Sequence, residues 1–290
     1  MNKILYLNCF SGISGDMMLG LLLDLLGKVD INPFLKGLAL EGYVVEASRS
    51  KKGGISGVDV RVRCDEKHCH RGLKEVLEVI EKSDINPEAS HKAETAFRLL
   101  AEAEGAVHGM PPESVHFHEV GAVDSIVDIV GSCILMDVLA PGLVISSPVN
   151  VGSGTVKCAH GELPVPAPAT MKLLEGIPVF SRGQPMERTT PTGAVLLKTF
   201  VDSFGTIPPG VVERTGYGLG DKDSDIANVL QGVLLGESIF TFTHVPGENH
   251  CGEIHEDHEH IHHHHDHSHP HIHEHEHEHE HVESCKSKIS

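Results

Sequence analysis

Residues 3–27 read KILYLNCFSGISGDMMLGLLLDLLG, and this stretch indicates the class of fold. An apolar run typical of a buried strand leads into the glycine-rich turn FSGISG, and a second apolar run follows. Asp16 stands where a helix N-cap is expected, and Gly27 stands where the helix should end. Because this helix is apolar on nearly every side, we expect it to lie at the centre of the molecule.

Strand and helix patterns continue to alternate away from this stretch. Paired strands are expected at 42–50 and 54–64, because apolar and charged residues alternate there. Amphipathic helices are expected at 73–83 and 87–109. A short strand is expected at 115–120, a largely buried helix at 123–140 and a strand at 142–152. A Pro-rich stretch with a short helix is expected at 161–176, a turn with a helix at 189–205, and two strands at 211–220 and 226–237. The sequence therefore predicts an α/β fold with a mixed sheet flanked by helices.

Composition limits the classes of function. The chain has 290 residues, 40% of them apolar, and a formal net charge of −18. Without a basic surface, nucleic acid is not expected as a partner, whereas acidic character suits cations. Seven cysteines at irregular spacing are typical of a reduced, cytoplasmic protein. No signal peptide is expected, and the longest apolar stretch, 17–27, is too short to cross a membrane.

A change in composition divides the chain into a globular domain, 1–245, and a tail, 246–290. The tail holds 16 of the 24 histidines and few large apolar side chains, so we expect it to be disordered without a ligand. Its interleaved imidazoles and carboxylates favour chelation of nickel, copper or zinc, and the acids argue against a purification tag. Four of the histidines are consecutive: His262, His263, His264 and His265.

Residues 116–128 read HFHEVGAVDSIVD and combine two imidazoles with three carboxylates. On a strand, His116 and His118 point to the same face, and Asp124 and Asp128 share one side of the following helix. Together they form a candidate metal site. The alternative is a polar rim in which the histidines are hydrogen-bonded surface groups and Asp124 only caps its helix.

Two turn-to-helix junctions are candidates for binding an anion, because a helix N-terminus presents free N–H groups. The first contains Ser11, Gly12 and Gly15, although Asp16 would repel an anion there and a simple tight turn explains the glycines. The second, TPTG, contains Thr190, Thr192 and Gly193 and has no acid beside it in the sequence. An ordinary capped helix start is the alternative for this junction.

Thiol and imidazole groups occur together in two short segments. CDEKHCH, 64–70, includes His68 and His70, and KCAHGE, 157–162, includes Cys158 and His160. Such pairs suit a soft divalent metal, although a lone cysteine is more often a small buried apolar residue.

Six blocks in this order resemble the LarC family, the nickel insertion proteins of the nickel-pincer cofactor of lactate racemase. The blocks are LYLNCFSGISGDM, RLLAEAE, HFHEVGAVDSIVDIVG, GTVKCAHGELPVPAPAT, TPTGAVLL and RTGYGLG. The resemblance implies a nickel insertase, of lyase or chelatase type, that supplies Ni(II) to pyridinium-3,5-bisthiocarboxylic acid mononucleotide. The product has one carbon–nickel and two sulfur–nickel bonds.

The resemblance also implies partners. Full-length members continue into a domain that resembles a nucleotide-binding module, so CTP with Mn(II) or Mg(II) is expected to act through a C-terminal half that is encoded separately or reached by frameshifting. The lactate racemase apoprotein is a further expected partner, and a homo-oligomer is expected. Two features depart from the family pattern: Asn8 replaces a usual aspartate, and KHCHRG replaces a longer histidine run.

Nickel must displace the C4 proton of the pyridinium ring, so the reaction needs a base. Glu119, Asp16 and Asp124 are the candidates. His116 and His118 are expected to share one cleft with the turn at 11–15 and the segment 158–160. The alternative function is nickel storage or a metallochaperone role without a catalytic step, since the tail alone accounts for metal binding.

Overall fold

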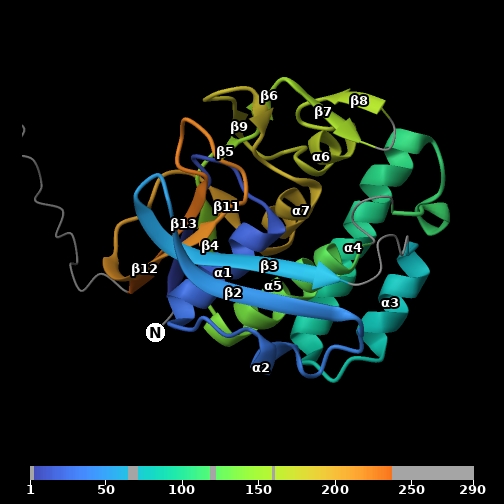
Figure 1. Cartoon of the computed structure of the whole chain (residues 1–290), viewed down its shortest axis with the longest axis horizontal. Helices are drawn as coiled ribbons and strands as arrows, with labels where there is room; N and C mark the ends of the chain where they lie inside the picture. Colours follow the sequence, from blue (N-terminus) through green and yellow to red (C-terminus); the bar gives the residue numbers. More distant parts are fainter. Residues whose placement is uncertain (1–2, 65–70, 118–121, 159–160, 237–290) are drawn as a thin grey trace, which may run out of the picture. The chain divides into compact units, whose positions relative to one another are not determined.

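A computed structural model of the chain describes residues 3–64, 71–117, 122–158 and 161–236, except for the side chain of Cys158 (Figure 1). These residues belong to one compact unit, Met1–Thr241. The predicted tail, 246–290, and the predicted domain boundary at 245 lie outside the described residues, so both stay predictions.

The stretch at 3–27 forms a strand, a turn and a helix, as predicted. Strand β1 is Ile4–Asn8 and helix α1 is Gly15–Leu26, and Gly27 ends the helix in the left-handed conformation. Nine of the 12 residues of α1 are buried, which confirms its central position. The predicted N-cap was wrong. Ser14 occupies the N-cap and Asp16 lies inside the first turn, because the extended backbone of the glycine turn ends two residues earlier than the pattern indicated.

Seven strands form one mixed sheet in the order β11-β4-β1-β13-β12-β3-β2. The pairs β1–β4, β4–β11 and β3–β12 are parallel, and the pairs β1–β13, β12–β13 and β2–β3 are antiparallel. The mixed sheet and the α/β class are therefore confirmed. The bounds are β2 Tyr43–Lys52, β3 Ile55–Cys64, β4 Leu143–Ser146, β11 Ser203–Phe204, β12 Val211–Leu219 and β13 Val229–Gly236.

Helices cover the sheet, and α1 packs directly on β3, β12 and β13 while contacting α5 on its other side (Figure 1). The helix α4 packs against α3, α5, α6 and α7. The bounds are α2 Asn32–Leu35, α3 Leu73–Glu81, α4 Pro87–His108, α5 Val123–Leu139, α6 Pro168–Leu173 and α7 Pro191–Phe200, with a 3-10 turn at Pro112–Ser114.

Three two-stranded sheets lie between β4 and α7 in the chain. They pair β5 Val149–Asn150 with β9 Val179–Phe180, β6 Gly152–Ser153 with β10 Met186–Glu187, and β7 Thr155–Cys158 with β8 Gly161–Pro164. The single strand predicted at 142–152 is therefore divided: Leu143–Ser146 pairs with β1, Val149–Asn150 pairs with β9, and Pro148 between them has no N–H to continue the ladder.

The short strand predicted at 115–120 is also absent from its described part, 115–117. His116 forms only an isolated bridge with Gly72, while the Phe117 side chain is buried against the core. Among the described residues, no helix is both long enough and apolar enough to cross a membrane.

Candidate functional site

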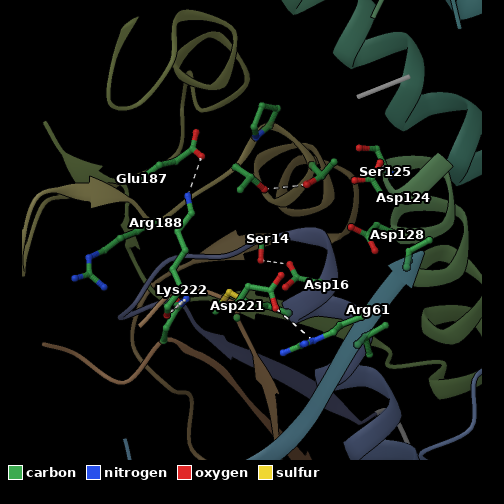
Figure 2. Close-up of a pocket in the computed structure, with 18 of the residues that line it drawn as sticks. Ser14, Asp16, Arg61, Asp124, Ser125, Asp128, Glu187, Arg188, Asp221 and Lys222 are labelled. Carbon is green, nitrogen blue, oxygen red and sulfur yellow. Dashed lines mark hydrogen bonds and ion pairs between the residues drawn. The ribbon is translucent and has the colours of Figure 1, made fainter. Parts of the chain in front are cut away.

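A cavity of about 740 Å³ opens where the first turns of α1, α5 and α7 meet β3 and the loop after β12 (Figure 2). The glycine turn that follows β1 leads to it, so the cavity lies beyond the carboxyl end of that strand. Ligands of α/β proteins commonly bind in this position. The cavity is the candidate functional site.

Four aspartates face this cavity: Asp16 on α1, Asp124 and Asp128 on α5, and Asp221 in the loop after β12 (Figure 2). Burial raises the pKa of Asp16 to about 6, and the charge of Asp221 adds to this rise, while a hydrogen bond from the Ser14 hydroxyl opposes it. Burial, followed by the charges of the other three aspartates, holds the pKa of Asp128 well above its usual range. Asp16 and Asp128 therefore bind protons more tightly than exposed aspartates do.

Positive groups line the cavity beside these acids. The guanidinium of Arg61 bonds to Asp59 at 3.1 Å and lies 3.8 Å from Asp221. The ammonium of Lys222 lies 3.7 Å from Glu187 and is more than half exposed. Arg61 shares its charge between two aspartates, and Lys222 forms only a long ion pair, so both cations remain available to an anionic ligand.

The start of α7 contributes hydroxyl groups and the positive end of a helix dipole. Thr190 is the N-cap, and its Oγ1 accepts a hydrogen bond from the N–H of Gly193 at 3.2 Å. The hydroxyls of Thr190 and Thr192 are 2.8 Å apart. The capped helix start, which was the alternative to an anion site at this junction, is therefore present. The structure adds that this junction shares its cavity with the aspartates, although no acid adjoins it in the sequence.

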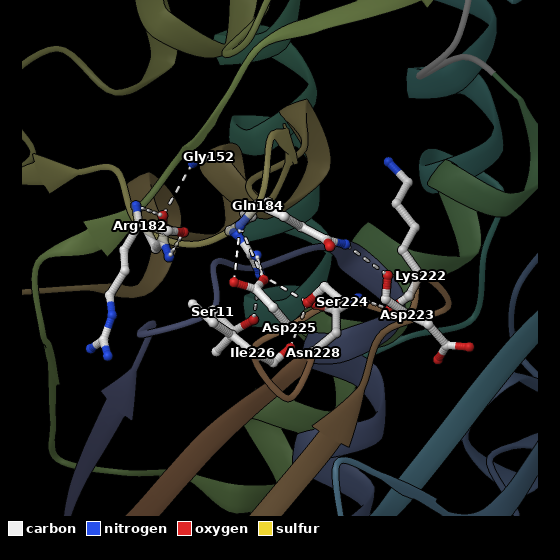
Figure 3. Close-up of polar contacts among 12 residues, drawn as sticks. Ser11, Gly152, Arg182, Gln184, Lys222, Asp223, Ser224, Asp225, Ile226 and Asn228 are labelled. Atoms are coloured by element: carbon white, nitrogen blue, oxygen red, sulfur yellow. Dashed lines mark hydrogen bonds and ion pairs between the residues drawn. The ribbon is translucent and has the colours of Figure 1, made fainter. Parts of the chain in front are cut away.

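Polar contacts around Ser224 and Asp225 hold the loop that carries Asp221 and Lys222 (Figure 3). The side chain of Arg188 is fully buried, pairs with Asp225 at 3.1 Å and donates to the hydroxyls of Ser11 and Ser224 at 3.2 and 3.3 Å. The backbone N–H of Gln184 donates to Asp225 at 3.0 Å. These contacts connect the glycine turn, the segment before α7 and the loop after β12, so they fix three of the cavity's edges relative to one another.

The glycine turn supports the cavity through its backbone. Gly12 has φ +92°, and a Cβ there would lie 2.0 Å from the carbonyl oxygen of Arg188. A Cβ on Gly15 would lie 2.4 Å from Oδ2 of Asp128. Within the described residues, Ser11 and Gly12 do not line the cavity. Ser11 accepts a hydrogen bond from Arg188, and Gly12 leaves room for the backbone of Arg188.

Several predicted site residues meet in this cavity. Asp16, Asp124, Thr190 and Thr192 line it, although as many as 176 positions separate them in the sequence. Gly193 lies directly behind them, against the backbone of Ile13. Two of the three candidate bases, Asp16 and Asp124, thus lie in one cavity with the candidate anion-binding junction.

The predicted metal ligands are not brought together in the described part of the chain. His116 is exposed and does not line the cavity. The other predicted ligands lie outside the described residues: His68, His70, His118, the side chain of Cys158, His160, His262, His263, His264 and His265. The candidate base Glu119 also lies outside them. Among the residues that the structure describes, no group of three or more His, Cys, Asp or Glu side chains is arranged to hold a metal ion. These ligands stay predictions.

Sequence reasoning did not single out Asp221, Lys222 or Arg61, and it noted Asp128 only as a neighbour of Asp124. Asp128 carried a detectable signal, because this charged residue stands between the apolar pairs Ile126–Val127 and Ile129–Val130. The loop residues carried none, since a run of charges after a strand is typical of any solvated turn.

Comparisons with known proteins agree with the six sequence blocks. A family model described as "Nickel insertion protein" matches residues 5–279. A "Putative nickel insertion protein" from Dictyoglomus thermophilum is 43% identical over 240 residues, which cover 82% of this chain and 61% of the relative. A "Pyridinium-3,5-bisthiocarboxylic acid mononucleotide nickel insertion protein" from Geobacillus kaustophilus is 44% identical over 247 residues, which cover 81% of this chain and 60% of the relative.

A relative with the same description from Desulfitobacterium hafniense strain DCB-2 is 45% identical over 238 residues, covering 81% of this chain and 58% of the relative. The chain therefore spans about three-fifths of the length of these relatives. No solved structure matches.

Proposed function

The chain belongs to the nickel insertion protein family, and from this we propose that it inserts Ni(II) into pyridinium-3,5-bisthiocarboxylic acid mononucleotide, completing the nickel-pincer cofactor of lactate racemase. Ni(II) is a substrate in this reaction. The cavity between α1, α5 and α7 is the proposed site, and the histidine-rich tail is proposed to concentrate the metal.

The observation that carries the proposal is the division of charge in the cavity. Aspartates line the side formed by α1 and α5, whereas hydroxyls and the positive end of a helix line the side formed by α7. The proposed substrate is divided in a comparable way, with a phosphate at one end and, at the other, a pyridinium ring whose two thiocarboxylates take up Ni(II), so that this end carries a net positive charge only together with the metal. The ring would lie beside the carboxylates, together with the incoming Ni(II), and the phosphate would lie at Thr190 and Thr192.

Asp16 is the proposed base. Nickel insertion breaks the C4–H bond, forms the carbon–nickel bond and leaves a proton for a base to accept. A base works best when its pKa lies near the working pH, and burial raises the pKa of Asp16 to about 6. Asp124 is exposed and accepts a hydrogen bond from the N–H of Ser125 at 2.8 Å, which makes it the weaker candidate. Glu119 lies outside the described residues.

The direct test is activation of lactate racemase apoprotein by the purified chain with Ni(II), the mononucleotide, CTP and the C-terminal half of a relative. We expect racemase activity with all components and none when this chain is omitted. Asp16→Asn should lower the insertion rate by at least about 100-fold. Asp30→Asn, outside the cavity, is the control and should leave the rate unchanged. Absence of activation with both halves folded would exclude the proposed function.

CTP with Mn(II) or Mg(II) is proposed to act through the C-terminal half, because the chain spans about three-fifths of its relatives. Contact with the racemase apoprotein and a homo-oligomeric state are further proposals. Omitting CTP from the activation assay tests the nucleotide requirement.

Nickel storage or a metallochaperone role is the second candidate, and the 16 histidines of residues 246–290 favour it. Deleting 246–290 separates the two functions. If insertion at saturating Ni(II) survives the deletion, the tail serves as a reservoir and the cavity carries the reaction. If insertion is lost while the shortened chain stays folded, storage in the tail is the essential function.

A further inference from the structure

Asp128 carries a carboxyl group that nothing in the described part of the chain compensates. It lies on α5 one turn after Asp124, and Figure 2 shows its carboxyl group directed into the cavity. Its Oδ2 is packed so closely against Gly15 that any side chain there would collide with it. Its Oδ1 is shielded from solvent and has no hydrogen-bond partner among the described residues. A buried carboxyl oxygen without a partner is costly, and a cation bound at the same carboxyl group offsets that cost.

The charged groups of the protein do not supply such a cation. Among the charged neighbours of Asp128, Asp16 acts on it most strongly, followed by Asp124 and Asp221, and all have the same sign. Within the described part of the chain, each cation that lines the cavity has another partner. These pairs are Arg61 with Asp59 and Asp221, Arg63 with Glu46, Lys222 with Glu187, and Arg188 with Asp225.

The donors on this wall suit a metal ion that is held loosely. Carboxylate oxygen is a hard ligand that divalent ions accept. No group of three or more His, Cys, Asp or Glu side chains in the described ranges is arranged to enclose a metal ion. An ion bound at Asp128 would therefore keep open positions for water and for an incoming ligand, which a closed structural site does not offer. Such openness is what a metal that is passed on requires.

We propose that Asp128 is the carboxylate that receives the divalent metal ion in the cavity, and that the metal binds there before the mononucleotide does. This inference rests on the proposed function, because Ni(II) is the ion which that reaction consumes. The ring end of the free mononucleotide has two thiocarboxylates against one ring charge, so it is net negative and the aspartates repel it. A metal ion bound first reverses the sign of the charge that the thiocarboxylates meet.

Transfer of the metal from Asp128 follows from the chemistry of the donors. Carboxylate oxygens hold Ni(II) weakly, whereas each thiocarboxylate offers a softer sulfur ligand. The sulfurs replace the oxygen of Asp128, and the electron pair of the C4–H bond forms the carbon–nickel bond. The proton goes to Asp16, and nickel remains Ni(II) throughout. Asp128 thus binds the metal substrate, while Asp16 acts as the base.

Mn(II) is the probe for this position. It prefers carboxylate oxygen and lies at the weak end of the affinity order for nitrogen ligands, so the histidines of 246–290 compete little for it. Electron paramagnetic resonance of the full chain measures free Mn(II) during a titration. We expect wild type to bind about one Mn(II) more than Asp128→Asn. Asp137→Asn changes another aspartate of α5, outside the cavity, and should bind as wild type does. Equal binding by wild type and Asp128→Asn overturns the proposal.

A second measurement uses wild type alone, so it does not depend on whether a variant folds. Fe(II) with ascorbate and hydrogen peroxide cuts the backbone beside a bound ion, and the masses of the fragments give the positions of the cuts. We expect cuts in the first turns of α1 and α5, apart from any in the tail, and excess Mn(II) should suppress them. Absence of cuts in these two turns overturns the proposal.

The order of binding is tested with the mononucleotide itself. We expect pyridinium-3,5-bisthiocarboxylic acid mononucleotide to bind wild type at least about tenfold more tightly with Mn(II) than without it, and Asp128→Asn to gain less. An equal gain in both proteins would refute metal loading at Asp128. Failure of the proposed function has a different result. If Asp128→Asn loses its Mn(II) but the complete assay does not activate the racemase, the metal position stands and nickel insertion is excluded.

Discussion

Asp16 leads to a prediction about stability that is independent of catalysis. Its pKa of about 6 lies above the ordinary value of 3.8, so the folded state binds this proton more tightly than the unfolded state does. The associated stability is present below about pH 4 and is lost as pH rises through 6. Asp16→Asn should therefore be more stable than wild type at pH 7 by on the order of 2 kcal/mol, with little difference near pH 4. Urea unfolding at both values tests this, and a gap independent of pH would contradict it.

Arg188 is the residue whose loss should most disturb the edges of the cavity. The side chain of Arg188 is completely buried, and Asp225, with which it forms an ion pair, is half-exposed. Asp225→Ala would leave the buried guanidinium without its counter-charge, and we expect it to lower the free energy of unfolding clearly. Arg182→Ala, an exposed arginine of the same segment, should change it by less than about 0.5 kcal/mol. Thermal or urea unfolding of both variants gives the comparison, and equal losses would refute the proposed importance of Arg188.

At the scale of elements, the cavity depends on the close approach of α7 to the turn before α1. Gly193 lies in the first turn of α7, and a Cβ there would lie 2.1 Å from the carbonyl oxygen of Ile13. That oxygen also accepts a hydrogen bond from the N–H of Thr190 at 3.1 Å, so neither backbone has room to yield. The two segments must therefore separate if a side chain is added.

We predict that Gly193→Ala lowers the free energy of unfolding by about 1–3 kcal/mol and weakens binding of pyridinium-3,5-bisthiocarboxylic acid mononucleotide. Gly205→Ala is the matched control, because its Cβ would meet nothing within 4 Å. Unfolding and titration of the two variants provide the measurement. Unchanged stability in Gly193→Ala would show that α7 and the turn are not tightly coupled.

At the scale of the whole molecule, the tail should make nickel binding depend on pH. Imidazoles bind metal only when neutral, and residues 246–290 contain 16 histidines. The number of Ni(II) ions bound per chain should therefore fall steeply as pH drops through about 6.5. Equilibrium dialysis at neutral and mildly acidic pH tests this, with the chain lacking 246–290 as the control. A flat profile would mean that thiols or carboxylates hold most of the metal.

Local pattern was sufficient for much of the fold. The apolar periodicity of α1, its end at Gly27, the Pro87 start of α4 and the Thr190 cap of α7 are all written in neighbouring residues, because capping and amphipathicity act over a few positions. The same reasoning failed where the local pattern was ambiguous. Asp16 has the chemistry of an N-cap, yet Ser14 takes that place because the turn packs against Arg188.

The composition of the tail and the six family blocks are also properties of the sequence alone, and together they indicate nickel insertion. The cavity came only from tertiary structure. Asp16, Asp128, Asp221 and Thr190 stand on four separate segments, and no periodicity relates them. The unusual proton affinity of Asp16 and Asp128 arises from burial and from repulsion between like charges at short distance. Both quantities exist only once the helices and loops have packed together, which is why the sequence named some of these residues but not the charge pattern they create.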